Sequence, residues 1–222
     1  MAELANHDVL WIVRRLPQRI ETLLKDNRDL FLAGGFIRAC IAQEAVNDID
    51  LFTVSKERAE QLAEAIAKEA GVPLFRTENA ISLKLGGLVV QFIHRWTFTS
   101  PVECVQSFDF TIARAAVWWD QIWVSTCDAA FYQDLAAKRL VYCHPVRNED
   151  AGGSLLRLLK FYGRGYRAPL ASTAGVVARL CDALDEGRLN LQPHESREQA
   201  MTRVLTGLLK EVDPNSIDVM RV

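Results

Sequence analysis

One short stretch constrains the fold more than any other part of the chain. The glycine pair Gly34–Gly35 separates an apolar run, Leu30–Ala33, from a segment with the pattern of a short helix. A second strand is predicted at Asp48–Thr53, in which Asp48 and Asp50 alternate with apolar residues. Successive side chains of a strand point to opposite faces, so both carboxylates share one face while the apolar residues enter the core. The order strand, glycine turn, helix, strand predicts an α+β domain with its polar groups gathered at one edge of a sheet.

These residue types predict a particular chemistry. Two neighbouring carboxylates, Asp48 and Asp50, repel each other unless a divalent cation lies between them. Oxygen donors suit Mg²⁺, which binds few carboxylates and shares its shell with substrate phosphates, and they also suit Mn²⁺. Gly34 and Gly35 offer backbone N–H groups that a phosphate can approach closely. A metal pair beside a phosphate cradle indicates phosphoryl or nucleotidyl transfer, whereas surface carboxylates beside a tight turn are the alternative.

Composition limits the partners and the compartment that we expect. The net charge of −2 over 222 residues argues against general coating of nucleic acid, but residues 138–170 hold seven basic residues against two acidic ones. Such a segment fits a polyanion, for example a triphosphate or an RNA end, although a solvated helix face explains it as well. Five scattered cysteines favour reduced thiols, and neither a signal segment nor an apolar run of membrane-spanning length is found. We therefore expect a cytoplasmic protein.

Periodicity and turn signals divide the chain into a head and a tail. In the head, residues 7–25 have a helical pattern that Pro17 kinks or divides, and Ser55 caps a helix that runs to Ala70. Further strands are expected at 81–85, 88–94, 110–118, 122–126 and 140–143, with a helix at 128–138. After the head, which we place at 1–150, a helical tail is expected at 151–222, with helices at 154–164, 172–186 and 195–211.

Five ordered motifs carry a family resemblance over roughly residues 28–166. They are Gly34-Gly35-Phe36-Ile37-Arg38, Asp48-Ile49-Asp50, Phe108-Asp109-Phe110-Thr111-Ile112, Tyr132-Gln133-Asp134-Leu135 followed by Arg139-Leu140, and the helical Leu155-Leu156-Arg157-Leu158-Leu159-Lys160-Phe161. In this order the chain resembles the head domain of poly(A) polymerases and tRNA CCA-adding nucleotidyltransferases, within the DNA polymerase β-like superfamily. The resemblance implies a mixed sheet flanked by helices, followed by a small C-terminal helical tail.

The resemblance also implies roles for individual residues. Asp48, Asp50 and Asp109 stand at catalytic positions, with Asp48 and Asp50 as the metal ligands. Gly34, Gly35, Arg38, Arg157 and Lys160 stand where the triphosphate is held. For Arg38 and Asp109 a structural ion pair is the alternative, and for Arg157 and Lys160 a solvated helix face.

Departures from the family pattern affect the nucleotide site. Ala39 follows Arg38 where the family has Asp, Ser107 stands in place of an Arg, and Ala113-Arg114 replaces Asn-Ala. A third carboxylate often found on a neighbouring strand corresponds here to Gln91. The departures leave the preferred nucleotide open.

The resemblance leads to a Mg²⁺-dependent transfer of a nucleoside monophosphate from an NTP to an acceptor hydroxyl, with release of pyrophosphate. The acceptor it favours is an RNA 3′ end, tRNA above others. Two alternatives stay open. One is a protein hydroxyl, as in compact nucleotidyltransferases of toxin–antitoxin or phage-defence systems, and the other is a degenerate module that binds nucleotide or RNA without turnover.

Overall fold

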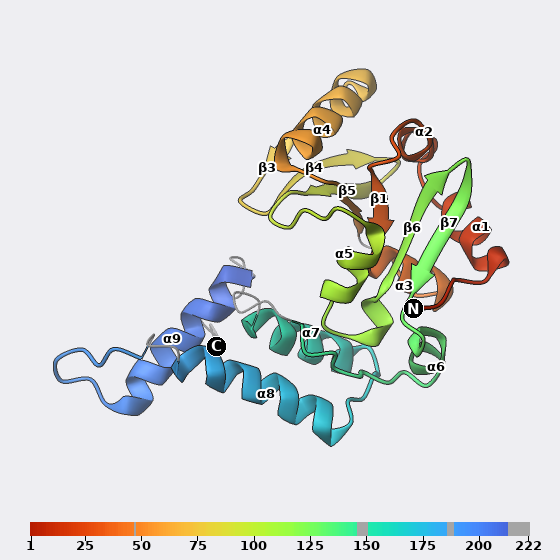
Figure 1. Ribbon diagram of the computed structural model, residues 1–222. Helices are drawn as coiled ribbons and strands as arrows, with labels where there is room; N and C mark the ends of the chain where they lie inside the picture. The colour runs from red at the N-terminus through yellow and green to blue at the C-terminus, as the bar shows by residue number, and fades with distance from the viewer. Residues whose placement is uncertain (47, 146–150, 186–188, 213–222) are drawn as a thin grey trace. The chain divides into compact units, whose positions relative to one another are not determined.

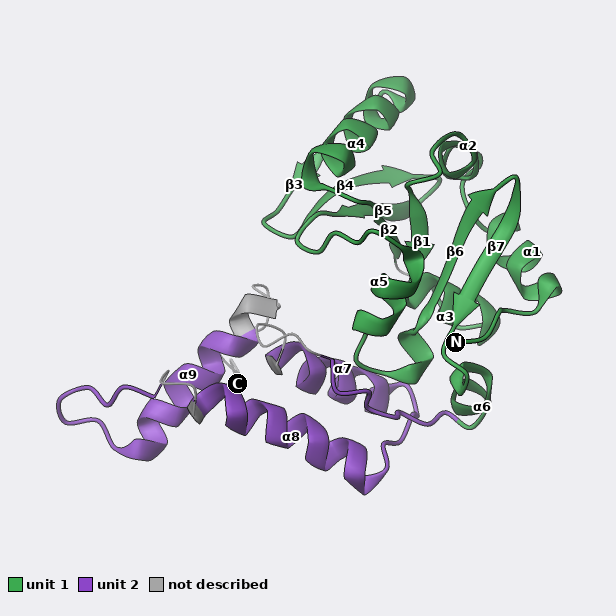
Figure 2. Cartoon of the chain, viewed as in Figure 1, with its two compact units in different colours: residues 1–137 green, residues 138–222 purple. Residues whose placement is uncertain are grey.

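The computed structural model describes residues 1–46, 48–145, 151–185 and 189–212. The chain forms two compact units, residues 1–137 and 138–222, which Figure 2 draws in green and purple. The division between the units falls after residue 137, before the boundary expected at residue 150. Residue 150 lies outside the described residues, so the expected domain boundary stays a prediction.

The described strands of the first unit form one mixed seven-stranded sheet with the order β3-β4-β5-β2-β1-β6-β7 (Figure 1). Only β2 and β5 pair in parallel, and the other neighbours are antiparallel. The strands are β1 (Phe31–Ala33), β2 (Asp48–Phe52), β3 (Phe75–Arg76), β4 (Ala80–Leu85), β5 (Leu88–Ile93), β6 (Ala115–Asp120) and β7 (Ile122–Cys127). This α+β arrangement confirms the expected fold class.

The helices of this unit begin and end largely where the sequence signals place them. Pro17 divides the first helical region, and Ser55 caps α4 by accepting a hydrogen bond from the Arg58 backbone N–H at 3.1 Å. Gly71 ends α4 in the left-handed conformation, with φ of 65°. The helices are α1 (Asn6–Arg14), α2 (Gln18–Asp26), α3 (Gly35–Ile41), α4 (Lys56–Ala70), α5 (Pro101–Ser107) and α6 (Phe131–Ala136), with a 3₁₀ turn at Thr111–Ala113.

The sheet has two different faces. We call the side that carries Asp48 and Asp50 the carboxylate face. At one end of this face, an apolar cluster with Phe31 and Phe52 at its centre packs against Cys104 and Val105 of α5. The rings of Phe31 and Phe52, which are directly paired in register, stack with centroids 5.9 Å apart. Helix α5 therefore covers part of the carboxylate face and leaves the start of β2 to the polar residues.

Helix α4 covers the other side of the sheet. The buried positions of β4 and β5 there include Ile81, Leu83 and Phe92. Arg76, whose register partner is Ile81, forms ion pairs with α4 residues Glu60 and Glu64. These pairs place α4 on the face opposite the two aspartates.

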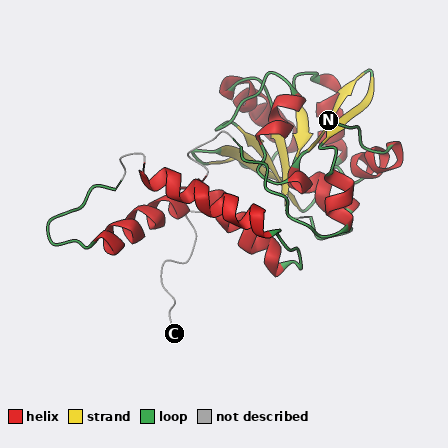
Figure 3. Cartoon of the chain, turned by 60° about the horizontal axis from the view of Figure 1, so that its bottom comes forward, coloured by secondary structure: helices red, strands yellow, loops and turns green. Residues whose placement is uncertain are grey.

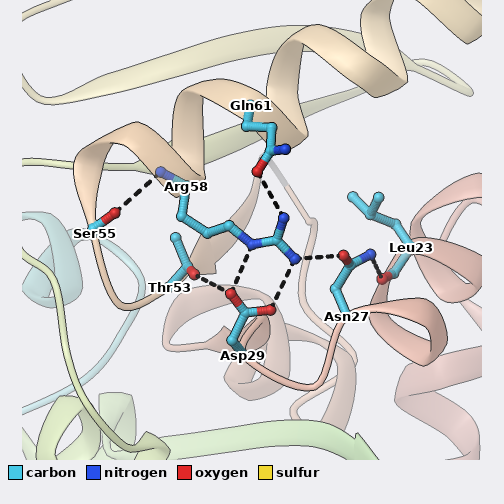
Figure 4. A network of polar contacts seen from close by, with 7 residues as sticks. All are labelled: Leu23, Asn27, Asp29, Thr53, Ser55, Arg58 and Gln61. Atoms are coloured by element: carbon cyan, nitrogen blue, oxygen red, sulfur yellow. Dashed lines mark hydrogen bonds and ion pairs between the residues drawn. The ribbon is translucent and has the colours of Figure 1, made fainter.

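A polar network joins α4 to the ends of β1 and β2 (Figure 4). Arg58 donates two hydrogen bonds to the Asp29 carboxylate, at 2.7 and 3.1 Å, and a third to the Asn27 side chain at 2.7 Å. Thr53, just after β2, also donates to Asp29 at 3.5 Å. The Arg58 guanidinium lowers the pKa of the Asp29 carboxyl below its ordinary value. The network fixes the strand ends farthest from Asp48.

The described elements of the second unit are the helices α7 (Ala151–Gly163), α8 (Leu170–Asp185) and α9 (Arg197–Val212), drawn in red in Figure 3. Leu180, Ala183 and Leu208 form their small core. Gly152 lets α7 and α9 approach closely, because a Cβ there would lie 2.5 Å from the Leu208 carbonyl oxygen. These helices agree with the helical tail of the expected fold class, whereas its extent over 151–222 stays a prediction.

Three local predictions were wrong. The strand expected from Phe110 begins only at Ala115, because Thr111 is drawn into a 3₁₀ turn by a 2.6 Å hydrogen bond to the buried Asp134. The helix expected at 128–138 is limited to α6. Residues 140–143 form no strand: Leu140 takes part only in the isolated bridge of Arg139 with Arg167, and the Tyr142 N–H donates to the Ser172 side chain at 3.1 Å. The short elements α5 and β3 were not anticipated.

Candidate active site

The glycine turn and the aspartate pair meet through the register of β1 and β2. Phe31 pairs with Phe52 and Leu32 with Leu51 in antiparallel order. If this register continues by one residue, Ala33 at the end of β1 lies beside Asp50. Gly34 and Gly35 are the next two residues of the chain. The two motifs therefore lie at the same edge of the sheet, as the sequence predicts.

Asp48 and Asp50 lie on one face, as the strand pattern requires. Both are half-buried, whereas Ile49 between them is fully buried. Residues two apart on a strand lie about 6.5–7 Å apart along it, so the two carboxylates can reach one cation. The donor set, oxygen only and open to water, fits Mg²⁺. Among the described residues, no group of three or more His, Cys, Asp or Glu side chains is arranged to hold a metal ion.

Gln91 occupies the neighbouring position on β5, directly beside Asp50 in the parallel register. β5 thus presents an uncharged amide beside Asp50. The site has one negative charge fewer than a site with three carboxylates.

The two glycines have different tasks. Gly34 has φ of 83° and ψ of −129°, a backbone conformation that residues with a Cβ rarely adopt. Its N–H donates to the Ala115 carbonyl at 2.9 Å. Gly35 begins α3, and a Cβ there would meet nothing within 4 Å. Gly34 therefore shapes the turn, and Gly35 leaves space beside it.

Phe108 is the aromatic neighbour of this turn. A Cβ on Gly34 would lie 3.4 Å from the Phe108 ring, which also packs edge-on against Phe52 with centroids 6.0 Å apart. Arg114 holds the adjoining backbone by donating to the carbonyls of Phe108 and Gln106, at 2.8 and 3.0 Å. This ring links the glycine turn to the apolar cluster under α5.

Arg38 and Asp109 are both buried, each with 4% of its surface exposed. Arg38 forms an ion pair with Glu44, which follows the end of α3. Asp109 follows Phe108 in the segment that leads to the 3₁₀ turn. Contact of Arg38 with a triphosphate and a catalytic task for Asp109 stay predictions.

Arg157 and Lys160 belong to α7 of the second unit. Arg157 is half-buried and Lys160 is exposed. Arg147, from the same basic segment, lies outside the described residues. The contribution of these cations to phosphate binding stays a prediction.

Sequence reasoning missed the polar and aromatic residues that share the carboxylate face. They are Phe75, Ser82 and Lys84 of β3 and β4, which no local motif marks. The only signal available was the period-two alternation of β4, in which Ser82 and Lys84 interrupt an apolar run.

Comparison with known proteins identifies the family. The family model described as Gabija anti-defense 2 family protein matches residues 4–138. The chain belongs to the Gabija anti-defense 2 family. A search of the curated proteins found no match. The matching family model is therefore not that of the poly(A) polymerases that the sequence resemblance named.

Solved structures confirm the nucleotidyltransferase fold of this family member. The Thermotoga maritima CCA-adding enzyme complexed with tRNA is 16% identical, with a TM-score of 0.60, over 99% of this chain and 58% of that one. A tRNA-processing enzyme in its apo form is 21% identical, with a TM-score of 0.58, over 89% of this chain and 59% of that one. A CCA-adding enzyme in complex with CTP is 18% identical, with a TM-score of 0.58, over 95% of this chain and 57% of that one. The chain spans less than two thirds of these proteins.

One further finding bears on location. In the part of the chain that the structure describes, no helix combines the length and the apolar character needed to cross a membrane. The cytoplasmic location stays a prediction.

Proposed function

We propose that this protein is a Mg²⁺-dependent nucleotidyltransferase that attaches a nucleoside monophosphate to a hydroxyl of a protein of the Gabija defence system. The hydroxyl oxygen would form a new bond to the α-phosphorus of an NTP while the bond to the leaving pyrophosphate breaks. The hydroxyl proton would pass to water. The observation that carries the chemistry is the pair Asp48 and Asp50, half-exposed on one face beside the Gly34–Gly35 turn.

The residues of the chain would act by binding and positioning. Asp48 and Asp50 would hold Mg²⁺, whose positive charge neutralises the α-phosphate when it is bound. Gly35 would let phosphate oxygens approach the backbone, while Gly34 fixes the turn. Asp109 is the third catalytic candidate, and Arg38, Arg157 and Lys160 are the candidate triphosphate contacts. Such catalysis consists mainly of positioning and charge stabilisation, so it requires no covalent enzyme intermediate.

The family supports a protein acceptor rather than the RNA end that the sequence resemblance favoured. Its description names activity against Gabija defence, and adding a bulky charged nucleotide to a defence protein is a direct way to inactivate it. The similar solved structures include enzymes with tRNA, which keeps an RNA acceptor as the competing proposal. A module that binds nucleotide without turnover is the third.

The test is label transfer with two differently labelled nucleotides. The purified protein is incubated with Mg²⁺, the purified proteins of a Gabija system, and each NTP labelled with ³²P at either the α or the γ position. We expect label on a Gabija protein from the α position only, because pyrophosphate leaves with the γ-phosphate. The variant Asp48→Asn/Asp50→Asn is expected to transfer none. Total tRNA replaces the Gabija proteins in a parallel reaction.

Each outcome selects one proposal. Label from the γ position would indicate a kinase and contradict nucleotidyl transfer. Label on tRNA alone would establish the RNA acceptor. Nucleotide binding without transfer to either acceptor would favour the inactive module.

A further inference from the structure

The sheet register extends the candidate site sideways across three more strands. Asp50 lies beside Gln91 of β5, Gln91 beside Ser82 of β4, and Ser82 beside Phe75 of β3. A second row runs in parallel from Asp48 through Val89 to Lys84. Because register partners place their side chains on the same face, both rows belong to the carboxylate face. We call Phe75, Ser82, Lys84, Val89 and Gln91 the acceptor strip.

Two residues of the strip are exposed and the other three are partly buried. Phe75 is 57% exposed, Lys84 is exposed, and Ser82, Val89 and Gln91 are half-buried. On the opposite face, which α4 covers, most of the alternate residues of β4 and β5 are buried, among them Leu83 and Phe92. On β5, the apolar cluster under α5 includes Ile93. Ile93 pairs with Ala80, in the row that follows the Gln91–Ser82 row on the same face. The two rows thus end in the exposed side chains of Phe75 and Lys84, and their other members keep part of their surface accessible.

An exposed aromatic ring at this position suggests that the strip binds a partner. A partner that covers the Phe75 ring would gain by removing its apolar area from water. Phe75 lies three strands from Asp50, which at about 4.8 Å per strand is about 14 Å, and an extended peptide covers that span in about four residues. Lys84 lies two strands from Asp48, at about 10 Å or about three residues.

The charge of the strip separates a protein segment from RNA. Lys84 is its one cation, and the nearby Arg76 points to the other face, where it pairs with Glu60 and Glu64. Proteins that bind RNA backbones use several basic side chains along the path of the phosphates. A strip with one lysine, one aromatic ring and uncharged polar groups fits a peptide with one acidic and one apolar side chain.

We infer that the strip binds the extended segment of the acceptor protein that carries the modified hydroxyl. This inference rests on the proposed function. The segment places its Ser, Thr or Tyr hydroxyl at Asp48 and Asp50, an acidic side chain about three residues away at Lys84, and an apolar side chain about four residues away at Phe75. The strip therefore decides which hydroxyl is modified, while the glycine turn and the aspartates bind the nucleotide.

The test measures transfer of α-³²P label to the purified Gabija proteins as a function of acceptor and NTP concentration. We expect Lys84→Glu and Phe75→Ala each to lower kcat/KM for the acceptor by about threefold to tenfold, mostly through KM. The KM for the NTP is expected to stay as in the unchanged protein. Both residues are exposed, so melting temperatures equal to that of the unchanged protein are expected to show that folding is intact.

Two control variants make a matched charge reversal and a comparable apolar truncation elsewhere. Lys56→Glu reverses an exposed charge at the start of α4, and Leu10→Ala removes an exposed apolar side chain from α1. Both are expected to transfer label as the unchanged protein does. Equal acceptor KM in the strip variants and the unchanged protein would overturn the inference and leave the proposed function standing. Absence of transfer by the unchanged protein, or transfer to tRNA alone, would overturn both.

Discussion

Replacing Gly34 with alanine separates the structural task of the glycine turn from the phosphate binding that we propose for it. Gly34 holds φ of 83° and ψ of −129°, where an L-residue is strained. Placing a Cβ there costs about 1–3 kcal/mol. The Cβ itself would make ordinary contact with the Phe108 ring at 3.4 Å, so backbone strain and not a clash determines the cost.

Gly35→Ala is the matched control, because it adds the same methyl group one residue later. Gly35 has no positive φ and nothing within 4 Å of an added Cβ, and it lies in a helix, where alanine is favoured. Its replacement is expected to keep or raise stability, by up to about 1 kcal/mol. If phosphate oxygens approach this backbone, the added methyl group lowers NTP binding all the same.

The assay is thermal denaturation with and without Mg²⁺–NTP. For a chain of this size, 1 kcal/mol corresponds to about 2–4 °C in melting temperature, so Gly34→Ala is expected to melt several degrees below the unchanged protein. Gly35→Ala is expected to melt at or above the unchanged protein without nucleotide and to gain less when nucleotide is added. Unchanged melting of Gly34→Ala, or an undiminished nucleotide shift in Gly35→Ala, would refute this division of tasks.

Three further predictions concern stability and thiol reactivity. The pKa of Asp29 is lowered in the folded state below its ordinary 3.8, so its contribution is present above that pH and is lost as pH falls through the folded pKa. Asp29→Asn is therefore expected to lower the free energy of unfolding at pH 7 by about 0.5–1 kcal/mol, since the pair with Arg58 is partly exposed. In urea titrations the difference between variant and unchanged protein is expected to shrink below pH 3.8. A difference that stays constant with pH would contradict this. Gly152→Ala is expected to destabilise the second unit by about 1–3 kcal/mol, because its Cβ meets the α9 backbone at 2.5 Å, and unchanged proteolysis of that unit would exclude the close packing. Burial raises the pKa of Cys40 to about 11, so iodoacetamide at pH 8 is expected to modify exposed Cys181 and spare Cys40, as peptide mapping would detect.

The parts of the fold that local patterns encode could be predicted from the sequence. The alternation of Asp48 and Asp50 with apolar residues follows from the period of a strand, and the Ser55 cap and Gly71 stop follow from helix-end chemistry. Helix α5 was missed although Ser100 and Pro101 carry an N-terminal signal, because its seven residues offer too little periodicity.

The parts that depend on pairing distant segments could not be predicted. The acceptor strip exists only because β2 pairs in parallel with β5, which brings Asp50 beside Gln91 and, two strands further, Phe75. The ion pair of Arg38 with Glu44 likewise depends on how the chain turns after α3. The local pattern predicts a strand at Thr111. It cannot show the hydrogen bond to Asp134, because that residue lies in α6, after the next hairpin.

The central claim is that Asp48 and Asp50 direct nucleotidyl transfer to a protein hydroxyl, and intact-mass spectrometry tests it most directly. The proteins of a Gabija system are incubated with Mg²⁺, mixed NTPs and either the unchanged protein or Asp50→Asn. Their intact masses are then measured, and any modified residue is located by peptide fragmentation. We expect one Gabija protein to be heavier by a nucleoside monophosphate on a Ser, Thr or Tyr residue, and no change in mass with Asp50→Asn. Unchanged masses in both reactions, or the same increase with Asp50→Asn, would contradict it.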